Sequence, residues 1–183
     1  RALLSPLERS RAERYRFAVH GSRFAVGRAR LREILGAYVD HDPASLELVD
    51  GPNGKPELAK PTGSRLRFNL AHCEGLAVCA VSFREVGIDL ELVDRERRPR
   101  WAAIAPRFFH EDERRALARL SGDAGWVEFL RIWTLKEACL KAAGFGLVAD
   151  PRSFSVAHVL SGDADSTTLA GREWRCAEFR PAA

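Results

Sequence analysis

The sequence predicts an α+β fold built from two related halves, residues 1–86 and 87–183. The order of the predicted elements indicates this fold: two helices and then strands come first, followed by a strand, three helices and further strands. The 183 residues are 46% hydrophobic and 30% charged, a composition that excludes wholesale disorder. No apolar stretch approaches the ~18 residues that would span a bilayer, so we expect no membrane partner.

The N-terminal half is predicted to begin with a capped helix. Ser5 can cap this helix, Pro6 suits its first turn, and Glu8 completes a capping box. The helix is expected to run to about residue 19 and to break at residues 20–22. A second helix is expected over residues 22–39, where apolar side chains recur every three or four positions. Strands are then expected over residues 46–49, 67–70 and 76–83, with a turn over residues 51–56.

The C-terminal half is predicted to begin with a strand over residues 86–93, because Ile88, Leu90 and Leu92 alternate with polar positions. Residues 95–99 are expected to be a charged linker. The helices expected next are residues 100–108, 111–120 and 126–143, and Gly144 is expected to end the last of them. Residues 154–160 and 173–179 are predicted to be strands.

Two carboxylates on the strand predicted over residues 86–93 are candidates for metal binding. Asp89 and Glu91 are two positions apart, so their side chains leave the same face of a strand. Carboxylates held side by side repel each other, and a cation relieves that repulsion. Hard oxygen ligands suit Mg²⁺, which takes one or two carboxylates together with phosphate oxygens and water. The alternative is an exposed strand face whose carboxylates pair with arginines.

The long helix predicted over residues 126–143 carries a second set of candidates. Trp133, Glu137 and Lys141 are spaced four residues apart and lie along one helix face. This line of side chains could bring a third carboxylate and a phosphate-binding cation to Asp89. The alternative is a solvated ion pair on the helix surface. His72 follows the end of a predicted strand, where its ring could reach a ligand or serve only the structure.

Positive charge is concentrated near the N-terminus. The net charge is +4, but the first 32 residues contain nine Arg against two Glu. This distribution predicts an anionic partner, which could be nucleic acid, a phosphorylated cofactor or an acidic protein. The alternative is a solvated helix face in an arginine-rich protein.

Cysteine usage and the N-terminus bear on the cellular compartment. The four cysteines form no CxxC pair, so we expect reduced thiols, no zinc site and a cytoplasmic location. The N-terminal stretch has no apolar segment of the kind found in secretory signals. The chain begins at Arg1 and contains no Met, so we expect it to be trimmed.

Four motifs occur together in the order typical of a known family. They are Gly54-Lys55-Pro56, Phe68-Asn69-Leu70-Ala71-His72, Val86-Gly87-Ile88-Asp89-Leu90-Glu91 and Trp133-Thr134-Leu135-Lys136-Glu137-Ala138-Cys139-Leu140-Lys141. The last two are about 40 residues apart, and their joint occurrence is specific. The chain resembles the 4′-phosphopantetheinyl transferases of the larger, monomeric, surfactin-type class over residues 5–156.

The resemblance implies an activity and a site. Members of the family move the 4′-phosphopantetheine arm of coenzyme A onto a serine of a carrier protein and release adenosine 3′,5′-bisphosphate. It implies two similar halves with the active site in the cleft between them, and Mg²⁺ (or Mn²⁺) on the pyrophosphate. The resemblance assigns metal binding to Asp89, Glu91 and Glu137, and binding of the pyrophosphate to Lys141. It assigns binding of the 3′-phosphate to His72 and Arg23, with Arg11 available, and the adenine pocket to Gly54, Lys55 and Pro56. The catalytic residues that it implies are Glu137, Lys141 and Asp89.

The expected partners are coenzyme A and an acidic apo acyl or peptidyl carrier protein, with no nucleic acid, and the protein is expected to be a monomer. A different Mg²⁺-dependent phosphoryl or nucleotidyl transfer enzyme, and a basic nucleic-acid-binding module, are the alternatives. Three departures from the family pattern stand out. Ala71 replaces a frequent Ser before His72, Glu8 stands where some members have a basic residue, and the family's first and last strands are not evident.

Overall fold

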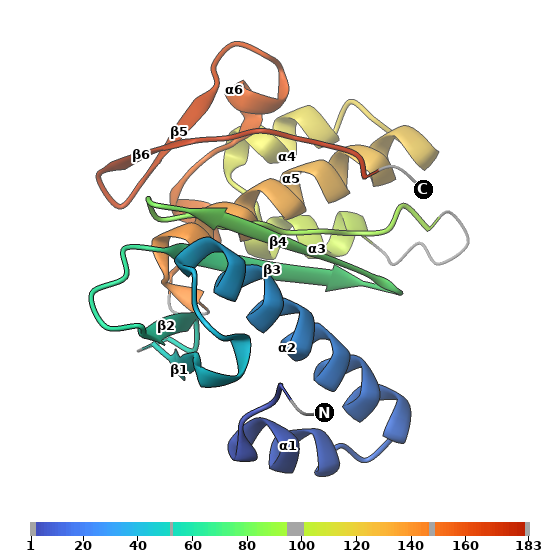
Figure 1. Cartoon of the computed structure of the whole chain (residues 1–183). Helices are drawn as coiled ribbons and strands as arrows, with labels where there is room; N and C mark the ends of the chain where they lie inside the picture. Colours follow the sequence, from blue (N-terminus) through green and yellow to red (C-terminus); the bar gives the residue numbers. More distant parts are fainter. Residues whose placement is uncertain (1–2, 52, 95–100, 147–148, 182–183) are drawn as a thin grey trace. The chain divides into compact units, whose positions relative to one another are not determined.

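The computed structural model describes residues 3–51, 53–94, 101–146 and 149–181 (Figure 1). Helices and strands are both present, so the α+β class predicted from the sequence is confirmed. The described residues group into two compact units. Unit 1 comprises Arg1–Gly51, Pro56–Arg67 and Val81–Arg84, and unit 2 comprises Pro52–Lys55, Phe68–Ala80 and Glu85–Ala183.

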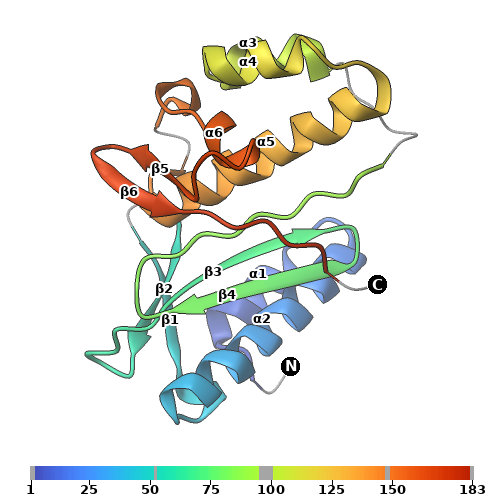
Figure 2. The same cartoon turned by 90° about the horizontal axis from the view of Figure 1, so that it is seen from above.

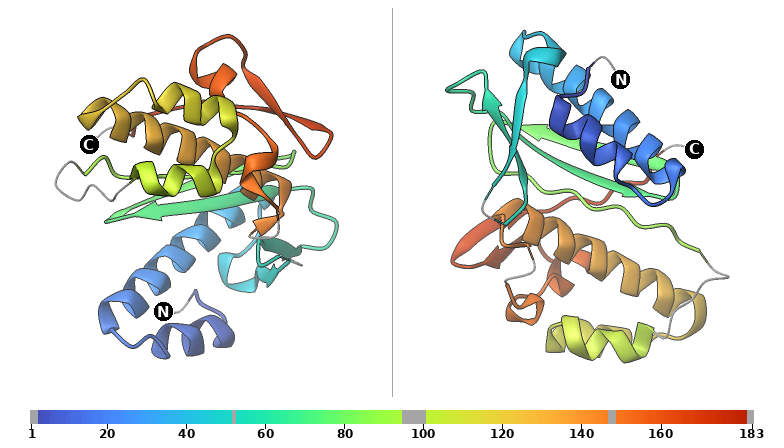
Figure 3. Two further views of the ribbon diagram at one scale, coloured as in Figure 1. Left: turned by 180° about the vertical axis from the view of Figure 1, so that it is seen from behind. Right: turned by 90° about the horizontal axis from the view of Figure 1, so that it is seen from below.

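Unit 1 begins with two helices that pack side by side, α1 (Pro6–Glu13) and α2 (Ala18–Val39) (Figure 3). The predicted capping box is confirmed, because Ser5 and Glu8 exchange hydrogen bonds of 2.8 and 3.2 Å. The predicted break at residues 20–22 is wrong, since these residues lie inside α2. Gly21 instead permits close packing, because a Cβ at this position would collide with the carbonyl oxygen of Ala12 in α1.

A buried arginine holds the rest of unit 1 to these helices. Arg32 is 2% exposed, and its guanidinium donates to the Glu8 carboxylate at 2.8 Å and to the carbonyl oxygens of Pro43 and Leu46 at 2.9 Å. These bonds fix the 3₁₀ turn Pro43–Ser45 that leads to the strand β1 (Glu47–Asp50). β1 pairs antiparallel with β2 (Pro56–Lys60), a strand that was not predicted because its Pro, Glu, Ala and Lys residues disfavour strands.

The strands β3 (Arg67–Cys73) and β4 (Leu76–Ser82) form a two-stranded sheet close to the predicted ranges. The strand predicted over residues 86–93 is wrong, because these residues are extended but belong to no strand of the described chain. The predicted charged linker over residues 95–99 lies outside the described residues.

Unit 2 is organised around the long helix α5 (Gly122–Ala143), which begins four residues before its predicted start and ends at Gly144 as predicted. Figure 2 shows α3 (Trp101–Phe108) and α4 (Glu111–Leu117) beside α5, in agreement with the predicted helices. Apolar side chains of these helices, with Phe109 from the link between α3 and α4, form the core, which includes Phe129, Ile132 and Leu135. None of the helices in the described ranges is long and apolar enough to cross a membrane.

The end of the chain packs on the same core. The strands β5 (Ser166–Leu169) and β6 (Arg172–Arg175) form an antiparallel pair that buries Leu169 and Trp174. The strand predicted over residues 154–160 is wrong, because Ala157–Leu160 form the short helix α6. The backbone N–H of Val156 donates to the Glu113 side chain at 2.8 Å, where a strand residue would pair with a neighbouring strand.

Candidate active site

Residues 85–90 are extended, and side chains from elsewhere in unit 2 bind their backbone. The N–H of Ile88 donates to the buried Asn69 Oδ1 at 2.9 Å. The Lys55 Nζ donates to the Val86 carbonyl oxygen at 3.2 Å, and the Lys141 Nζ donates to that of Ile88 at 3.4 Å. The alternating sequence therefore gives the expected extended backbone, but side chains replace the sheet partner.

Gly87 brings this segment against α5. A Cβ on Gly87 would collide with the carbonyl oxygen of Ala138 and the backbone nitrogen of Ala142, so only glycine allows the approach. In Figure 2 the segment that follows β4 runs beside α5. The contact sets Asp89, two residues further on, beside the C-terminal half of the helix.

Asp89 and Lys141 form an ion pair at this contact. The Lys141 Nζ lies 2.6 Å from Asp89 Oδ1, and the two side chains are 31% and 11% exposed. The other oxygen, Asp89 Oδ2, is buried and has no hydrogen-bond partner among the described residues. A buried carboxylate oxygen without a partner is costly, so Asp89 has the capacity to bind a further cation or donor.

Glu91 and Glu137 share the electrostatic environment of this pair. Partial burial raises the pKa of the Glu91 carboxyl, and the charges of Asp89 and Glu137 raise it further while Lys141 lowers it. Burial likewise raises the pKa of Glu137, again with a contribution from Asp89 and opposition from Lys141. Three carboxylates and one ammonium group are therefore close enough to influence one another's protonation.

These four residues are not arranged as a metal site in the described chain. No group of three or more His, Cys, Asp or Glu side chains within the described ranges could hold a metal ion. Lys141 is the cation that Asp89 contacts. The assignment of Asp89, Glu91 and Glu137 as metal ligands stays a prediction.

The helix α5 presents Trp133, Glu137 and Lys141 as half-buried side chains, as their spacing predicts. Trp133 packs edge-on against Phe108 at a centroid distance of 5.3 Å and stacks on Phe129 at 6.1 Å. These aromatic contacts hold α5 next to α3. They thereby fix the direction in which Glu137 and Lys141, the next two residues on this face of α5, leave the helix.

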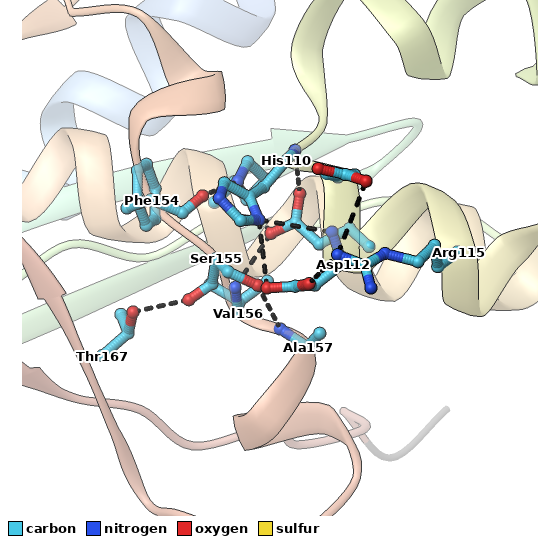
Figure 4. Close-up of polar contacts among 11 residues, drawn as sticks. His110, Asp112, Arg115, Phe154, Ser155, Val156, Ala157 and Thr167 are labelled. Carbon is cyan, nitrogen blue, oxygen red and sulfur yellow. Dashed lines mark hydrogen bonds and ion pairs between the residues drawn. The ribbon is translucent and has the colours of Figure 1, made fainter.

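Lys136 lies on a different face of α5 and is fully enclosed. Its Nζ lies 2.7 Å from Glu113 Oε1 and donates to the Phe154 carbonyl oxygen at 2.6 Å, with side-chain exposures of 3% for Lys136 and 0% for Glu113. Glu113 also accepts hydrogen bonds from the backbone N–H groups of His110 and Val156, both at 2.8 Å (Figure 4). Burial lowers the pKa of Lys136, and the Glu113 charge opposes that shift. Lys136 therefore pairs in the core of unit 2, although it belongs to the same sequence motif as the partly exposed Lys141.

The predicted adenine-binding residues have other contacts in the structure. The Lys55 ammonium group is bound by the Glu85 carboxylate at 3.1 Å and by the carbonyl oxygens of Val86 and Ala142 at 3.2 Å. Pro56 begins β2 in unit 1. Lys55 thus joins the turn before β2 to the end of α5, and its contact with adenine stays a prediction.

The predicted 3′-phosphate ligands come from both units. Arg11 of α1 places its guanidinium 5.1 Å from the centre of the Phe24 ring, and Arg23 is exposed on α2. His72 is exposed near the end of β3 in unit 2, as the sequence suggested. Whether the three side chains meet on one phosphate stays a prediction. Glu8, the departure from the family pattern, has a structural use as the partner of Arg28 and Arg32.

Two supporting residues escaped the sequence analysis. The hydrogen bond between Asn69 and the backbone of Ile88 was not predicted, although a buried Asn inside a strand is unfavourable and could have suggested a specific bond. Glu113 is the third helical residue after His110, a capping-box spacing that indicates the start of α4. Nothing in this spacing indicates that Glu113 also contacts Lys136.

A family model described as "4'-phosphopantetheinyl transferase superfamily" matches residues 85–182, just over half of the chain. The chain belongs to this superfamily. The match includes the Asp89 segment and α5, the elements that form the charged cluster. The resemblance stated from the motifs alone is confirmed.

Curated phosphopantetheinyl transferases are similar over longer stretches. The 4'-phosphopantetheinyl transferase HetI of Nostoc sp. is 41% identical over 80% of this chain and 62% of its own length. The corresponding enzyme psf-1 of Bacillus pumilus is 32% identical over 87% of this chain and 65% of its own length. Sfp of Bacillus subtilis is 27% identical over 85% and 66%. The chain therefore spans about two thirds or less of these relatives.

Proposed function

We propose that this protein transfers the 4′-phosphopantetheine arm of coenzyme A to a serine of a carrier protein and releases adenosine 3′,5′-bisphosphate. Membership of the superfamily supports the reaction class. The observation that carries the proposal is the charged cluster of Asp89, Glu91, Glu137 and Lys141, which lies inside the matched region. Transfer of a phosphoryl-type group depends on positioning and on neutralising charge, and this cluster supplies both.

The carboxylates of this cluster are of the chemical type that Mg²⁺, or Mn²⁺ in its place, takes as ligands, although the described side chains do not converge as a metal site. The buried Asp89 Oδ2 has no partner among the described residues, and burial raises the pKa of Glu91 and Glu137, with a smaller contribution from the charge of Asp89. Three oxygen ligands of this kind suit a hard divalent cation. We assign Asp89, Glu91 and Glu137 to hold it, and when bound the ion would neutralise negative charge on the pyrophosphate.

The protein's own residues position the reacting groups. Lys141 is proposed to bind the pyrophosphate of coenzyme A, because its side chain is 31% exposed and its ammonium group needs only to turn from Asp89. Its charge matters most as the departing oxygen becomes negative. Glu137 is proposed to take the proton from the carrier serine, directly or through a water on the metal.

The two halves are proposed to enclose coenzyme A between them. The 3′-phosphate would be bound by Arg23 and His72, with Arg11 available as a further ligand. The adenine pocket would be lined by Lys55 and Pro56. Exposure of Arg23 and His72 is consistent with a ligand role. Arginine suits phosphate because its planar guanidinium can make two parallel hydrogen bonds.

The carrier protein is proposed to be acidic and to approach a basic surface. Nine arginines lie in the first 32 residues, and opposite charges speed encounter more than they raise final affinity. We further propose that the protein acts as a monomer in the cytoplasm. Four cysteines without a disulfide in the described chain are compatible with a reducing compartment.

The test is mass spectrometry of apo acyl and peptidyl carrier proteins incubated with the protein, coenzyme A and Mg²⁺. We expect the carrier to gain the phosphopantetheine mass on one serine. The Asp89→Asn variant, which keeps the side-chain shape and removes the charge, should give no product. Product formed with a nucleoside triphosphate in place of coenzyme A, and none with coenzyme A, would contradict the proposal and indicate another phosphoryl or nucleotidyl transfer.

A further inference from the structure

Two thiol groups of unit 2 lie side by side although 36 positions of sequence separate them. Cys139 belongs to α5, and Cys176 directly follows β6. Their sulfur atoms are 3.8 Å apart, and both thiols are free. A disulfide bond is ~2.0 Å long, so a small movement of either side chain would bring the sulfur atoms to bonding distance.

The surroundings hold this pair in place. Cys139 is 4% exposed and is part of the core, and Cys176 packs against the same core. The backbone N–H of Cys176 donates to the Asp165 carbonyl oxygen at 2.8 Å, which continues the pairing of β5 with β6. The contact between the sulfur atoms therefore comes from two anchored segments and not from two freely rotating side chains on the surface.

We propose that Cys139 and Cys176 form a thiol–disulfide exchange site, which takes a small disulfide oxidant such as oxidised glutathione and becomes an intramolecular disulfide. The bond would join α5 to the segment that follows β6. The proposal does not depend on the transferase reaction, so the two can be tested separately.

Cys176 is the entry thiol, because it is half-buried while Cys139 is enclosed. The hydrogen bond with Cys139 lowers the pKa of Cys176, and this favours the thiolate that attacks disulfides. In the first step the Cys176 sulfur bonds to one sulfur of oxidised glutathione, the glutathione disulfide breaks, and one glutathione thiolate leaves and takes up a proton.

In the second step Cys139 completes the exchange. Its sulfur lies 3.8 Å from that of Cys176 and is therefore placed to attack the mixed disulfide. The Cys139 thiol then gives up its proton and its sulfur attacks that of Cys176, releasing the second glutathione. The protein loses two electrons and two protons, and one oxidised glutathione becomes two reduced molecules.

The other two cysteines provide internal controls. Cys73 in β3 and Cys79 in β4 are half-buried like Cys176. Burial raises the pKa of the Cys79 thiol, so this cysteine should react slowly. Accessibility alone would let Cys73 react as readily as Cys176, whereas a paired site predicts selective oxidation of Cys176 and Cys139.

The experiment treats the folded full chain with oxidised glutathione, blocks the remaining thiols with an alkylating reagent and maps the peptides by mass spectrometry. We expect a peptide that links Cys139 to Cys176, lighter by about two hydrogen masses than the sum of its parts and lost on reduction. Cys139→Ser should stop at a glutathione adduct on Cys176, and Cys176→Ser should form neither product.

A second measurement separates this chemistry from damage to the fold. Oxidation should raise the melting temperature of the wild-type protein, because the cross-link restricts the unfolded chain, and should not raise it in Cys139→Ser. Absence of the linked peptide in the folded protein, its formation only after denaturation, or faster modification of Cys73 than of Cys176 would each overturn the proposal.

Discussion

Replacing Lys136 with methionine should strongly destabilise the protein, because it leaves the Glu113 carboxylate charged and enclosed. The side chains of the pair are 3% and 0% exposed, and their charged atoms are 2.7 Å apart. Removing one partner of a buried ion pair typically costs ~3–5 kcal/mol. The two backbone N–H groups that also bind Glu113 lessen the loss but do not neutralise the charge.

Urea denaturation followed by tryptophan fluorescence measures this cost, since Trp126 and Trp133 lie in the same helix as Lys136, α5. Lys141→Met is the matched control, because that lysine is 31% exposed and its ion pair should contribute about 1 kcal/mol or less. The double variant Glu113→Gln, Lys136→Met removes both charges and should be more stable than Lys136→Met alone. A loss for Lys136→Met as small as that for Lys141→Met would refute the reasoning.

The same two variants separate folding from chemistry. At a temperature where both are folded, Lys141→Met should lower turnover more than it weakens coenzyme A binding, because its charge is needed most as the nucleotide departs. Lys136→Met should keep most of its turnover per folded molecule. If Lys136→Met lost turnover while Lys141→Met retained it, the assignments of both Lys141 and Glu137 would be wrong.

Three further predictions concern the charged cluster and its support. Because the pKa of Glu137 is raised, the metal-free folded protein holds the proton of this carboxyl more tightly than the unfolded chain does. The free energy of unfolding should therefore fall as the pH rises above about 4.5, the ordinary pKa of a glutamate. Added Mg²⁺ should therefore raise the melting temperature more at pH 8 than at pH 5, and the Glu137→Gln variant should lose this difference. His72→Ala should weaken binding of coenzyme A far more than binding of 3′-dephospho-coenzyme A, as calorimetry would show, and an equal loss would assign His72 another role. Gly87→Ala should lower the free energy of unfolding by about 1–3 kcal/mol, because the added Cβ would meet the backbone of α5. Gly75→Ala is the control and should change this free energy little, because a Cβ at that position meets nothing within 4 Å. Equal effects of the two substitutions would contradict the close contact at Gly87.

Periodicity and capping signals indicated most of the helices of this protein, but they missed α6 and extended the first helix to about residue 19, past its end at Glu13. The apolar steps and the capping box predicted α1 and most of α2, and Gly144 was correctly placed at the end of α5. These signals act between residues that are near in sequence. They gave a wrong prediction at Gly21, which suggested a helix break. This glycine instead lies inside α2, where the absence of a Cβ allows α1 to pack closely.

The strands were predicted less well for a related reason. Alternation over residues 86–93 correctly indicated an extended backbone, but it cannot say whether a strand or a side chain will bind that backbone. Asn69 and Lys55 bind it here, and both are distant in sequence. Residues 154–160 are apolar enough for a strand, yet Glu113 takes the N–H of Val156 and a short helix follows.

The sequence by itself determined the family and the chemical types of the candidate residues, because motif spacing is a property of the chain alone. It also placed Trp133, Glu137 and Lys141 on one face of a helix, since the helix period fixes that. Only the tertiary structure decided that Lys141 contacts Asp89, and that one buried oxygen of Asp89 has no partner in the described part of the chain. It also decided that Lys136 lies in the core with Glu113. The physical reason is that burial and pairing depend on which segments meet in space. Two lysines five residues apart on one helix are thereby given opposite surroundings.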